Sequence, residues 1–417
     1  MLQSTTDVIG CADSPVKPGR RTLLHVDLES LFDHHLELPA PGTPLESRML
    51  PPGGGVCALA DERGRLILLL AAQNLRRTLG LRLNPPDDGP RRPRADLRAL
   101  ARRLCWIPTF SVFENSLTYL RVARRLNPDR YRKDLAFGPV WFARLDPRQP
   151  FPRWVADRFA FLPPLIDVGP FVHRAACRRF IELLEDLFDL CRYHDVLKQA
   201  PHAQACAYKD MGRCPAPCDG TVSADRYRDA VLASIEFARG KSDTRLSHLQ
   251  RAMADAARRL DFENAARFRE RLARATRLLA DDGRLLPTPD KFRYLVVQRA
   301  GGTSRVKPFY VNQGNVRVGQ PVKLKDIEQA TPAWTDNMWR PPDDTDPPDA
   351  ACRSECLWAV SHHLIKKDKA SGLFLHESQI GNAPELAGKI IGRFRKTPSK
   401  SPQDAISIDG DADARLK

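Results

Sequence analysis

Apolar residues recur with helical spacing through the middle of the chain. Residues 172–190 and 223–239 place apolar side chains three or four positions apart, which puts them on one face of a helix. Residues 244–259 and 262–280 repeat this pattern on either side of Asp261, whose carboxylate can cap a helix N-terminus. The sequence therefore predicts two amphipathic helices followed by a helical hairpin.

Two other regions show the alternation that is typical of β-strands. Val56–Ala60 and Leu66–Leu70 flank the turn Asp61–Gly64, in which the glycine suits a positive φ, so we expect a β-hairpin. Residues 291–325 alternate in the same way and are expected to form strands.

Breaks rich in proline, glycine and charge divide the chain. They lie at 38–54, 84–96 and 341–350, and the aspartates of the last break, Asp349 among them, are expected to belong to a solvated linker. The fold class expected is α+β. Its predicted parts are an N-terminal tail (1–50), a small α/β domain (51–140), a connector with a cysteine-rich region (141–240), a helical hairpin (241–282), a small β-rich C-terminal domain (288–395) and a disordered tail (396–417).

The charge of the chain favours an anionic partner. Its 417 residues include 66 Lys and Arg against 51 Asp and Glu, a formal net charge of +15, which points first to nucleic acid. No run of about 18 apolar residues occurs, so no membrane-spanning helix is expected. The first 20 residues lack the apolar core of a secretory signal. We therefore expect a cytoplasmic protein whose ten cysteines stay reduced.

Basic residues gather in 91–134, where 12 Lys and Arg stand against four acidic residues. Two arginine-rich helices are expected here, over 94–104 and 115–127. Their side chains can contact DNA phosphates without reading the base sequence, or they can form a solvated charged face, and the sequence leaves both possibilities open. The candidate DNA-binding residues are Arg98, Arg102, Arg121, Arg124 and Arg125.

Four cysteines cluster in the middle of the chain, at Cys191, Cys206, Cys214 and Cys218. The intervening stretches of 14, 7 and 3 residues match neither paired zinc-knuckle spacing nor common ferredoxin spacings. Gly212, Pro215 and Pro217 hold the chain around the last two cysteines in turns rather than helix, so the thiolates can converge on one metal or cluster. The spacing indicates a metal of unknown kind, with four buried or idle thiols as the alternative.

Several motifs in this region resemble the middle of UvrC, the incision subunit of bacterial nucleotide excision repair. They are GPF at Gly169–Phe171, LFDLC ending at Cys191, GRC-x3-C ending at Cys218 and SADRYRDAVLASIEFARGK at 223–241. In that family the cysteines hold a 4Fe–4S cluster. The resemblance therefore implies a 4Fe–4S cofactor on the four cysteines, with zinc as the alternative, and a partner that is double-stranded or damaged DNA.

The second arm of the predicted hairpin, RRLDFENAARFRERL, resembles the UVR motif, with which UvrC grips the helicase UvrB. Small alanines allow close helix approach, and larger apolar residues can serve as anchors. The resemblance implies a UvrB-type helicase partner, and the alternative is an ordinary packed hairpin. The partner-binding residues implied are Phe262, Ala265, Ala266, Arg269 and Leu272.

Upstream, the segments 55–57 (GVC) and 68–70 (LLL) resemble an eroded GIY-YIG nuclease core. Such nucleases need a tyrosine, an arginine that neutralises phosphate charge and a glutamate that binds a divalent metal. The corresponding positions are Cys57, Leu68, Thr78 and a non-acidic residue near Tyr119. The resemblance implies a degenerate GIY-YIG-like domain without catalytic residues.

An enzyme remains the alternative interpretation of this domain. Arg76 or Arg77 could replace the missing arginine and Glu114 the missing glutamate, which would make the protein an active excinuclease subunit or a structure-specific endonuclease. Residues 309–320 (FYVNQGNVRVGQ) also resemble the start of UvrC's C-terminal half, but we find no room after 325 for its RNase H-like or helix–hairpin–helix domains. The favoured expectation is a UvrC-like repair protein that binds a UvrB-type helicase and DNA without nuclease activity.

Overall fold

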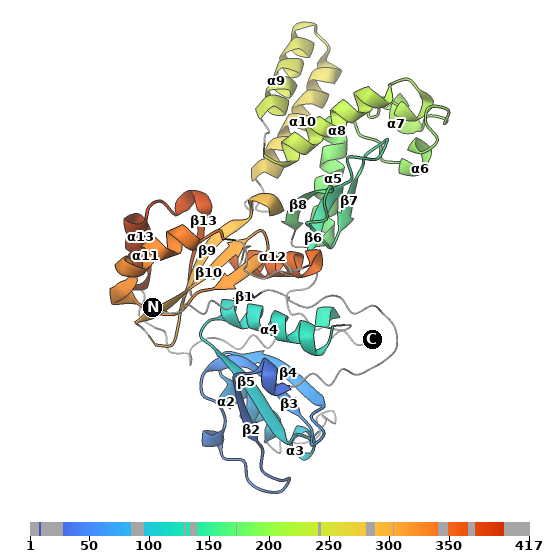
Figure 1. Cartoon of the computed structure of the whole chain (residues 1–417). Coiled ribbons are helices and arrows are strands. Elements are labelled where there is room, and N and C mark those ends of the chain that lie inside the picture. Colours follow the sequence, from blue (N-terminus) through green and yellow to red (C-terminus); the bar gives the residue numbers. More distant parts are fainter. Residues whose placement is uncertain are drawn as a thin grey trace.

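The computed structural model describes residues 8–9, 28–84, 96–128, 131–133, 140–171, 173–240, 243–280, 288–302, 304–340, 349–365 and 372–395. These residues form three antiparallel sheets and a helical hairpin that projects from the body (Figure 1). The expected tail at 396–417 lies outside the described residues. No helix in the described ranges is long and apolar enough to cross a membrane.

The N-terminal unit is a four-stranded antiparallel sheet with strand order β2-β5-β3-β4. The strands are β2 (His34–Glu37), β3 (Gly54–Ala60), β4 (Leu66–Ala72) and β5 (Arg103–Thr109). The helices are α1 (Leu28–Leu31), α2 (Leu75–Leu83), α3 (Leu97–Leu100) and α4 (Val112–Leu126), with 3-10 turns at Ser47–Met49 and Tyr131–Lys133. Cys57 and Leu59 pack towards α2, and Ala58 and Ala60 pack with Val122 of α4, so helices cover both faces of the sheet.

The predicted β-hairpin is confirmed. Gly64 adopts φ +75°, and the Asp61 carboxylate accepts hydrogen bonds from the backbone N–H groups of Arg63 and Arg65 at 2.9 and 2.8 Å. Strands β3 and β4 then pair in antiparallel register, with Cys57 opposite Leu70.

Two expectations for this unit were wrong. Residues 34–37 do not belong to a tail, because β2 pairs with β5 along its whole length. In the described part of the helix expected over 94–104, only Leu97–Leu100 is helical, and residues 103 and 104 begin the central strand β5 instead. The strand is favoured because its apolar side chains, such as Leu104 and Ile107, are buried between the two layers of helices.

The middle unit contains a three-stranded sheet with strand order β7-β6-β8 and a helical layer. Helix α5 (Arg174–Phe188) buries Phe180, Leu184 and Leu187 beside the sheet, and α8 (Ala224–Ala238) adds Tyr227 and Val231 to the same core, which confirms both predicted amphipathic helices. The remaining elements are β6 (Trp141–Leu145), β7 (Trp154–Asp157), β8 (Ile166–Phe171), α6 (His194–Leu197), α7 (Ala207–Asp210) and the 3-10 turn Pro217–Asp219.

The predicted helical hairpin is also confirmed. Helices α9 (Asp243–Arg258) and α10 (Phe262–Ala280) pack antiparallel and extend away from the sheets (Figure 1). The Asp261 carboxylate accepts a hydrogen bond from the N–H of Asn264 at 3.2 Å, which is the expected N-cap.

The C-terminal unit is mixed rather than β-rich. Its sheet has the order β1-β11-β10-β9-β13, with β12 pairing to β10. Leu295 and Val297 face a core shared with α11 and α13, whereas Val296 faces α12, so helices lie on both faces. The strands are β1 (Val8–Ile9), β9 (Arg293–Arg299), β10 (Arg305–Asn312), β11 (Asn315–Val318), β12 (Val322–Lys323) and β13 (Gly372–His376). The helices are α11 (Ile327–Asn337), α12 (Ala350–Ile365) and α13 (Ala383–Arg395), with 3-10 turns at Pro289–Lys291, Leu324–Asp326 and Glu377–Gln379.

Candidate functional site

The tip of the α9–α10 hairpin exposes large apolar side chains. Leu260 is 72% exposed and Phe262 is 68% exposed, and Leu260 has φ +60° at the turn between the helices. Of the other partner-binding residues predicted here, Ala266 and Arg269 are exposed and Ala265 is half-buried. The tip therefore offers an apolar contact surface with a basic neighbour.

The base of the hairpin serves a different purpose, because it holds α10 on the middle unit. Leu272 and Phe268 pack against the core of that unit, so Leu272 is a docking residue of the hairpin rather than part of its open surface. Arg271 forms an ion pair with Asp189 at 2.5 Å, and Arg267 donates to the carbonyl of Met211 at 2.7 Å. The hairpin is thus connected directly to the loop that carries the cysteines.

The four predicted metal-ligating cysteines lie in three successive loop segments. Cys191 follows the end of α5, and Cys206 precedes α7. Cys214 lies before the 3-10 turn Pro217–Asp219, and Cys218 lies within it. All four are free thiols; Cys206 is half-buried and the others are buried. Ala216, between the last two, adopts φ +56°, which turns the chain back on itself.

The cysteine side chains influence one another. A hydrogen bond with Cys191 lowers the pKa of the Cys214 thiol to about 6, whereas that bond and burial raise the pKa of Cys191. Burial and the nearby Cys214 raise the pKa of Cys218, with a smaller contribution from Cys206. Cys214 is therefore the thiol that most readily becomes a thiolate, the form that binds metals.

The donor set fits a thiolate-bound metal or cluster, but the side chains are not drawn tightly together. Among the described residues, no group of three or more His, Cys, Asp and Glu side chains is arranged to hold a single metal ion. Outside the cluster, the described cysteines Cys57, Cys105, Cys177, Cys352 and Cys356 are buried, and burial raises the pKa of Cys57, Cys177 and Cys356 to about 12. Cys352 is disulfide-bonded, contrary to the expectation that all ten cysteines stay reduced.

The positions expected to correspond to GIY-YIG catalytic residues lie in packed surroundings, and Tyr119 lies apart from the other three. Cys57 is buried and Leu68 half-buried in the core beneath α2, and Thr78 lies half-buried on α2 itself. Tyr119 lies on α4 and packs instead against the core that α4 shares with the C-terminal unit. The apolar side chains of the β3–β4 hairpin thus pack in the core of the N-terminal unit.

Two of the residues considered as replacements, Glu114 and Arg76, are engaged within the protein. Both carboxylate oxygens of Glu114 have partners: Lys307 forms an ion pair at 2.8 Å, and the N–H of Phe110 donates at 2.9 Å. Arg76 donates to the carbonyl of Leu50 at 3.1 Å, and Arg77 is exposed on α2. Glu114 begins α4 on the other side of the sheet from α2, so these groups are poorly placed to act on one phosphate.

Arg98, Arg102 and Arg124, three of the candidate DNA-binding arginines, make polar contacts within the protein. Arg98 donates to the carbonyls of residues 39, 40 and 43, and Arg102 donates to those of residues 99 and 101. Arg124 forms ion pairs with Asp349 and Glu355. The side chain of Arg121 is half-buried, and that of Arg125 is exposed. The DNA-binding role of these residues stays a prediction.

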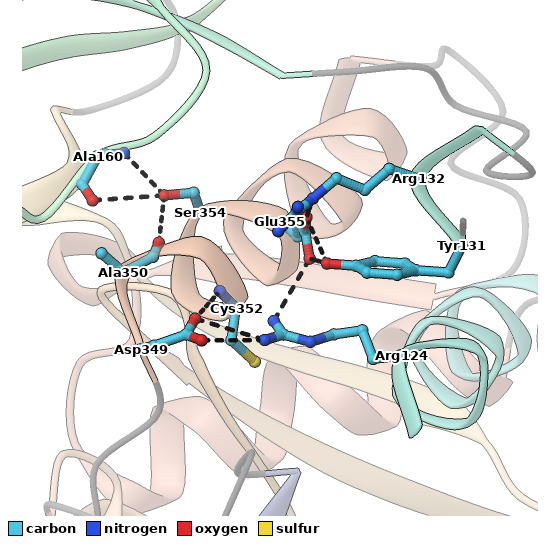
Figure 2. Close-up of polar contacts among 9 residues, drawn as sticks. All are labelled: Arg124, Tyr131, Arg132, Ala160, Asp349, Ala350, Cys352, Ser354 and Glu355. Carbon is cyan, nitrogen blue, oxygen red and sulfur yellow. Dashed lines mark hydrogen bonds and ion pairs between the residues drawn. The ribbon is translucent and has the colours of Figure 1, made fainter. Parts of the chain in front are cut away.

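A polar cluster that the sequence did not reveal joins α4 to α12 (Figure 2). The buried Glu355 carboxylate accepts hydrogen bonds from the Tyr131 hydroxyl at 2.6 and 2.8 Å and forms an ion pair with Arg132 at 2.6 Å. Arg124 lies 3.4 Å from Glu355 and 3.2 Å from Asp349. Asp349 also caps α12, so it belongs to this cluster and not to a solvated linker.

Ser354, one residue before Glu355, extends this cluster to the middle unit. Its hydroxyl accepts a hydrogen bond from the N–H of Ala160 at 2.8 Å and donates to the carbonyl of Ala350 (Figure 2). The cap before the apolar run of α12 was the one sequence signal that could have located this cluster.

Comparisons with protein families identify two parts of the chain. Residues 142–237 match the family described as UvrC/Cho excinuclease, middle domain, and residues 243–275 match the UvrB/uvrC motif. The first match covers the middle unit with its cysteine segments, and the second covers the α9–α10 hairpin. The chain is therefore UvrC-like, with a UvrC middle domain and a UVR motif.

Curated relatives support the same assignment. UvrABC system protein C of Salinispora arenicola is 31% identical over 246 residues, which are 58% of this chain and 36% of that protein. UvrABC system protein C of Syntrophotalea carbinolica is 28% identical over 281 residues, 65% of this chain and 44% of that protein. The match thus spans less than half of these relatives' length. No solved structure matches the chain.

Proposed function

We propose that this protein acts in nucleotide excision repair as a UvrC-like factor that binds a UvrB-type helicase and DNA and has no nuclease activity of its own. The observation that supports this best is the exposed apolar tip of the α9–α10 hairpin. Leu260 and Phe262 lie open within the segment that matches the UvrB/uvrC motif. Exposed apolar anchors on a helical hairpin are typical of surfaces that bind another protein.

Two matched substitutions test the partner. Phe262→Asp in the full chain is expected to abolish binding to a purified UvrB-type helicase in isothermal titration calorimetry, because it places a charge in the apolar contact. Leu232→Asp, on α8 at a side chain that is 50% exposed, should leave binding unchanged. Circular dichroism checks that both variants fold. Unchanged binding by Phe262→Asp would reject the hairpin tip as the contact surface.

The proposed absence of nuclease activity is supported by the packing of the N-terminal unit. Cys57 and Leu68 are packed in an apolar core, and the Glu114 carboxylate is held by Lys307. Purified protein is expected to shift duplex DNA at low salt, and less at high salt, without nicking it in Mg²⁺ or Mn²⁺, with or without UvrA and UvrB. Metal-dependent nicking that disappears in Glu114→Gln would instead favour the endonuclease alternative.

We further propose that Cys191, Cys206, Cys214 and Cys218 hold a 4Fe–4S cluster, with zinc as the alternative. The support is a set of four free thiols, three of them buried, in which Cys214 readily becomes a thiolate. When bound, the cluster would cross-link the three loop segments and so contribute to folding stability.

The cofactor is tested by anaerobic purification and metal analysis. Iron and sulfide are expected in the wild-type protein and in Cys177→Ala, whose buried thiol lies outside the four. Cys214→Ser should lose the iron and unfold at a lower temperature. Stoichiometric zinc without iron would overturn the iron–sulfur assignment.

A further inference from the structure

A cavity of about 760 Å³ lies between the middle and C-terminal units, and none of the sites described above uses it. One wall comes from β8, α5 and the end of α8, and the other comes from β9, β13, α12 and α13. Cavities of this size between structural units commonly bind small molecules. The GPF tripeptide at Gly169–Phe171 contributes two of its residues to the first wall.

The lining of this cavity is basic. Arg239, Lys291 and Arg393 contribute to it, together with His363 and His376, and none of the described lining residues is acidic. Arg239 and Lys291 are exposed, and neither has an ion-pair partner among the residues that the structure describes. The cavity therefore favours an anionic ligand.

One buried polar group in the lining lacks a partner. Thr288 is 9% exposed, and its hydroxyl makes no hydrogen bond within the described structure. Buried hydroxyl groups are normally paired, so an unpaired one at a cavity wall indicates a ligand or water that would complete it. A phosphate oxygen can accept the hydrogen bond that this hydroxyl is able to donate.

The remaining lining is largely apolar and aromatic. Phe171, Tyr294 and Phe374 all contribute to it. Burial raises the pKa of Tyr294 to about 12, so its hydroxyl remains a hydrogen-bond donor at neutral pH. A Cβ on Gly169 would approach the Phe171 ring to 3.1 Å at φ +134°, so this residue must stay a glycine for the wall to keep its shape. Aromatic rings at the wall can stack on a planar base.

We propose that this cavity binds a nucleoside phosphate. The phosphate would contact Arg239, Lys291 and the Thr288 hydroxyl, and the base would pack against the aromatic wall. Inorganic phosphate alone would leave most of the volume and the apolar wall unused. The same chemistry can come from a free mononucleotide or from the terminal nucleotide of a DNA strand.

Calorimetry on the full chain tests the proposal with AMP, adenosine and inorganic phosphate as probes. AMP is expected to bind at least tenfold more tightly than either of the others, since both halves of the site contribute. Arg239→Gln and Lys291→Gln should each weaken AMP roughly tenfold, the effect of losing one charge-assisted hydrogen bond. Thr288→Val, which keeps the side-chain shape, should weaken AMP without altering the affinity for adenosine.

The control removes two positive charges elsewhere: Arg178→Gln with Lys325→Gln, both exposed and outside the lining, should leave AMP binding unchanged. The proposal would be overturned if AMP and adenosine bind with equal affinity, or if no phosphorylated probe binds. It would also be overturned if the control variant loses as much AMP affinity as the variants in the lining.

Short oligothymidylates with and without a 5′-phosphate distinguish the two sources. Tighter binding of the phosphorylated strand, competitive with AMP and reduced by Lys291→Gln, identifies a strand end as the ligand. AMP binding without any strand competition identifies a free mononucleotide. Neither measurement involves a UvrB-type partner, so the outcome is independent of the function proposed for the hairpin.

Discussion

Two carboxylates differ in the donors that surround them. Glu355 is buried but faces the Tyr131 hydroxyl and the guanidinium groups of Arg124 and Arg132, which match its charge. Glu185 on α5 has no such set of donors among the residues that the structure describes. Burial raises its pKa to about 7, and the nearby Arg192 only partly offsets this, while acidic neighbours on the same helix add to it.

The raised pKa of Glu185 predicts a pH-dependent stability. The folded protein binds this proton more tightly than the unfolded chain, so the free energy of unfolding should fall as pH rises from about 4.5 to 7 and level off above. Glu185→Gln is expected to remove this fall and to stabilise the protein at pH 8 by up to about 3 kcal/mol. Urea unfolding at several pH values measures the free energy of unfolding of both proteins. If the free energy of Glu185→Gln depends on pH as that of the wild type does, the raised pKa of Glu185 is contradicted.

At the scale of elements, the turn between β10 and β11 depends on its backbone conformation and on a close neighbour. Gln313 and Gly314 have φ of +51° and +83°, and Asn312 pairs with Asn315 across them, which is a two-residue hairpin turn. A Cβ at Gly314 would collide with the carbonyl of Arg353 on α12. The turn thus fixes where the helix can rest on the sheet.

We predict that Gly314→Ala destabilises the protein by more than 2 kcal/mol in urea unfolding, because backbone strain and a backbone collision add. Gly42→Ala is the matched control. Gly42 has φ +88° but no atom within 4 Å of an added Cβ, so this variant should show the strain alone, about 1 kcal/mol. Equal losses in the two variants would show that the contact with α12 does not matter.

The elements that the sequence predicted correctly are those defined by local patterns. The β3–β4 hairpin, the helices α5 and α8 and the Asp261 cap each follow from a few neighbouring residues. The helix expected over 94–104 overlapped only the first two residues of strand β5, and the strand itself was missed because its pairing with β2 and β3 is not visible locally.

The polar cluster around Glu355 escaped prediction for a similar reason. Tyr131 and Glu355 lie 224 positions apart, and no local pattern indicates that they meet. The cysteine segments and the hairpin could be located because their motifs are short and continuous. The cavity between the middle and C-terminal units could not, since its lining comes from segments far apart in the chain.

At the scale of the whole molecule, α4 connects the N-terminal unit to the C-terminal unit through one apolar core. The Phe113 ring lies 5.1 Å from Phe309 and 5.6 Å from Phe374 between ring centroids, both nearly perpendicular. The ion pair between Glu114 and Lys307 lies at the next position along the helix. The N-terminal unit is therefore joined to the C-terminal unit through a shared core.

This arrangement predicts that one substitution in α4 weakens both units together. Phe113 is 1% exposed, so Phe113→Ala should cost about 3–5 kcal/mol of unfolding free energy by leaving a cavity in the shared core.

Hydrogen exchange followed by mass spectrometry should show lost protection in β4 and in β10 alike, because both pack around α4 and the core it shares. Val112→Ala, at the neighbouring side chain that is 42% exposed, should change neither region. If protection falls in β10 while β4 keeps its own, the two units are held by separate cores. Loss of protection in both strands would mean that the N-terminal unit stabilises the C-terminal unit.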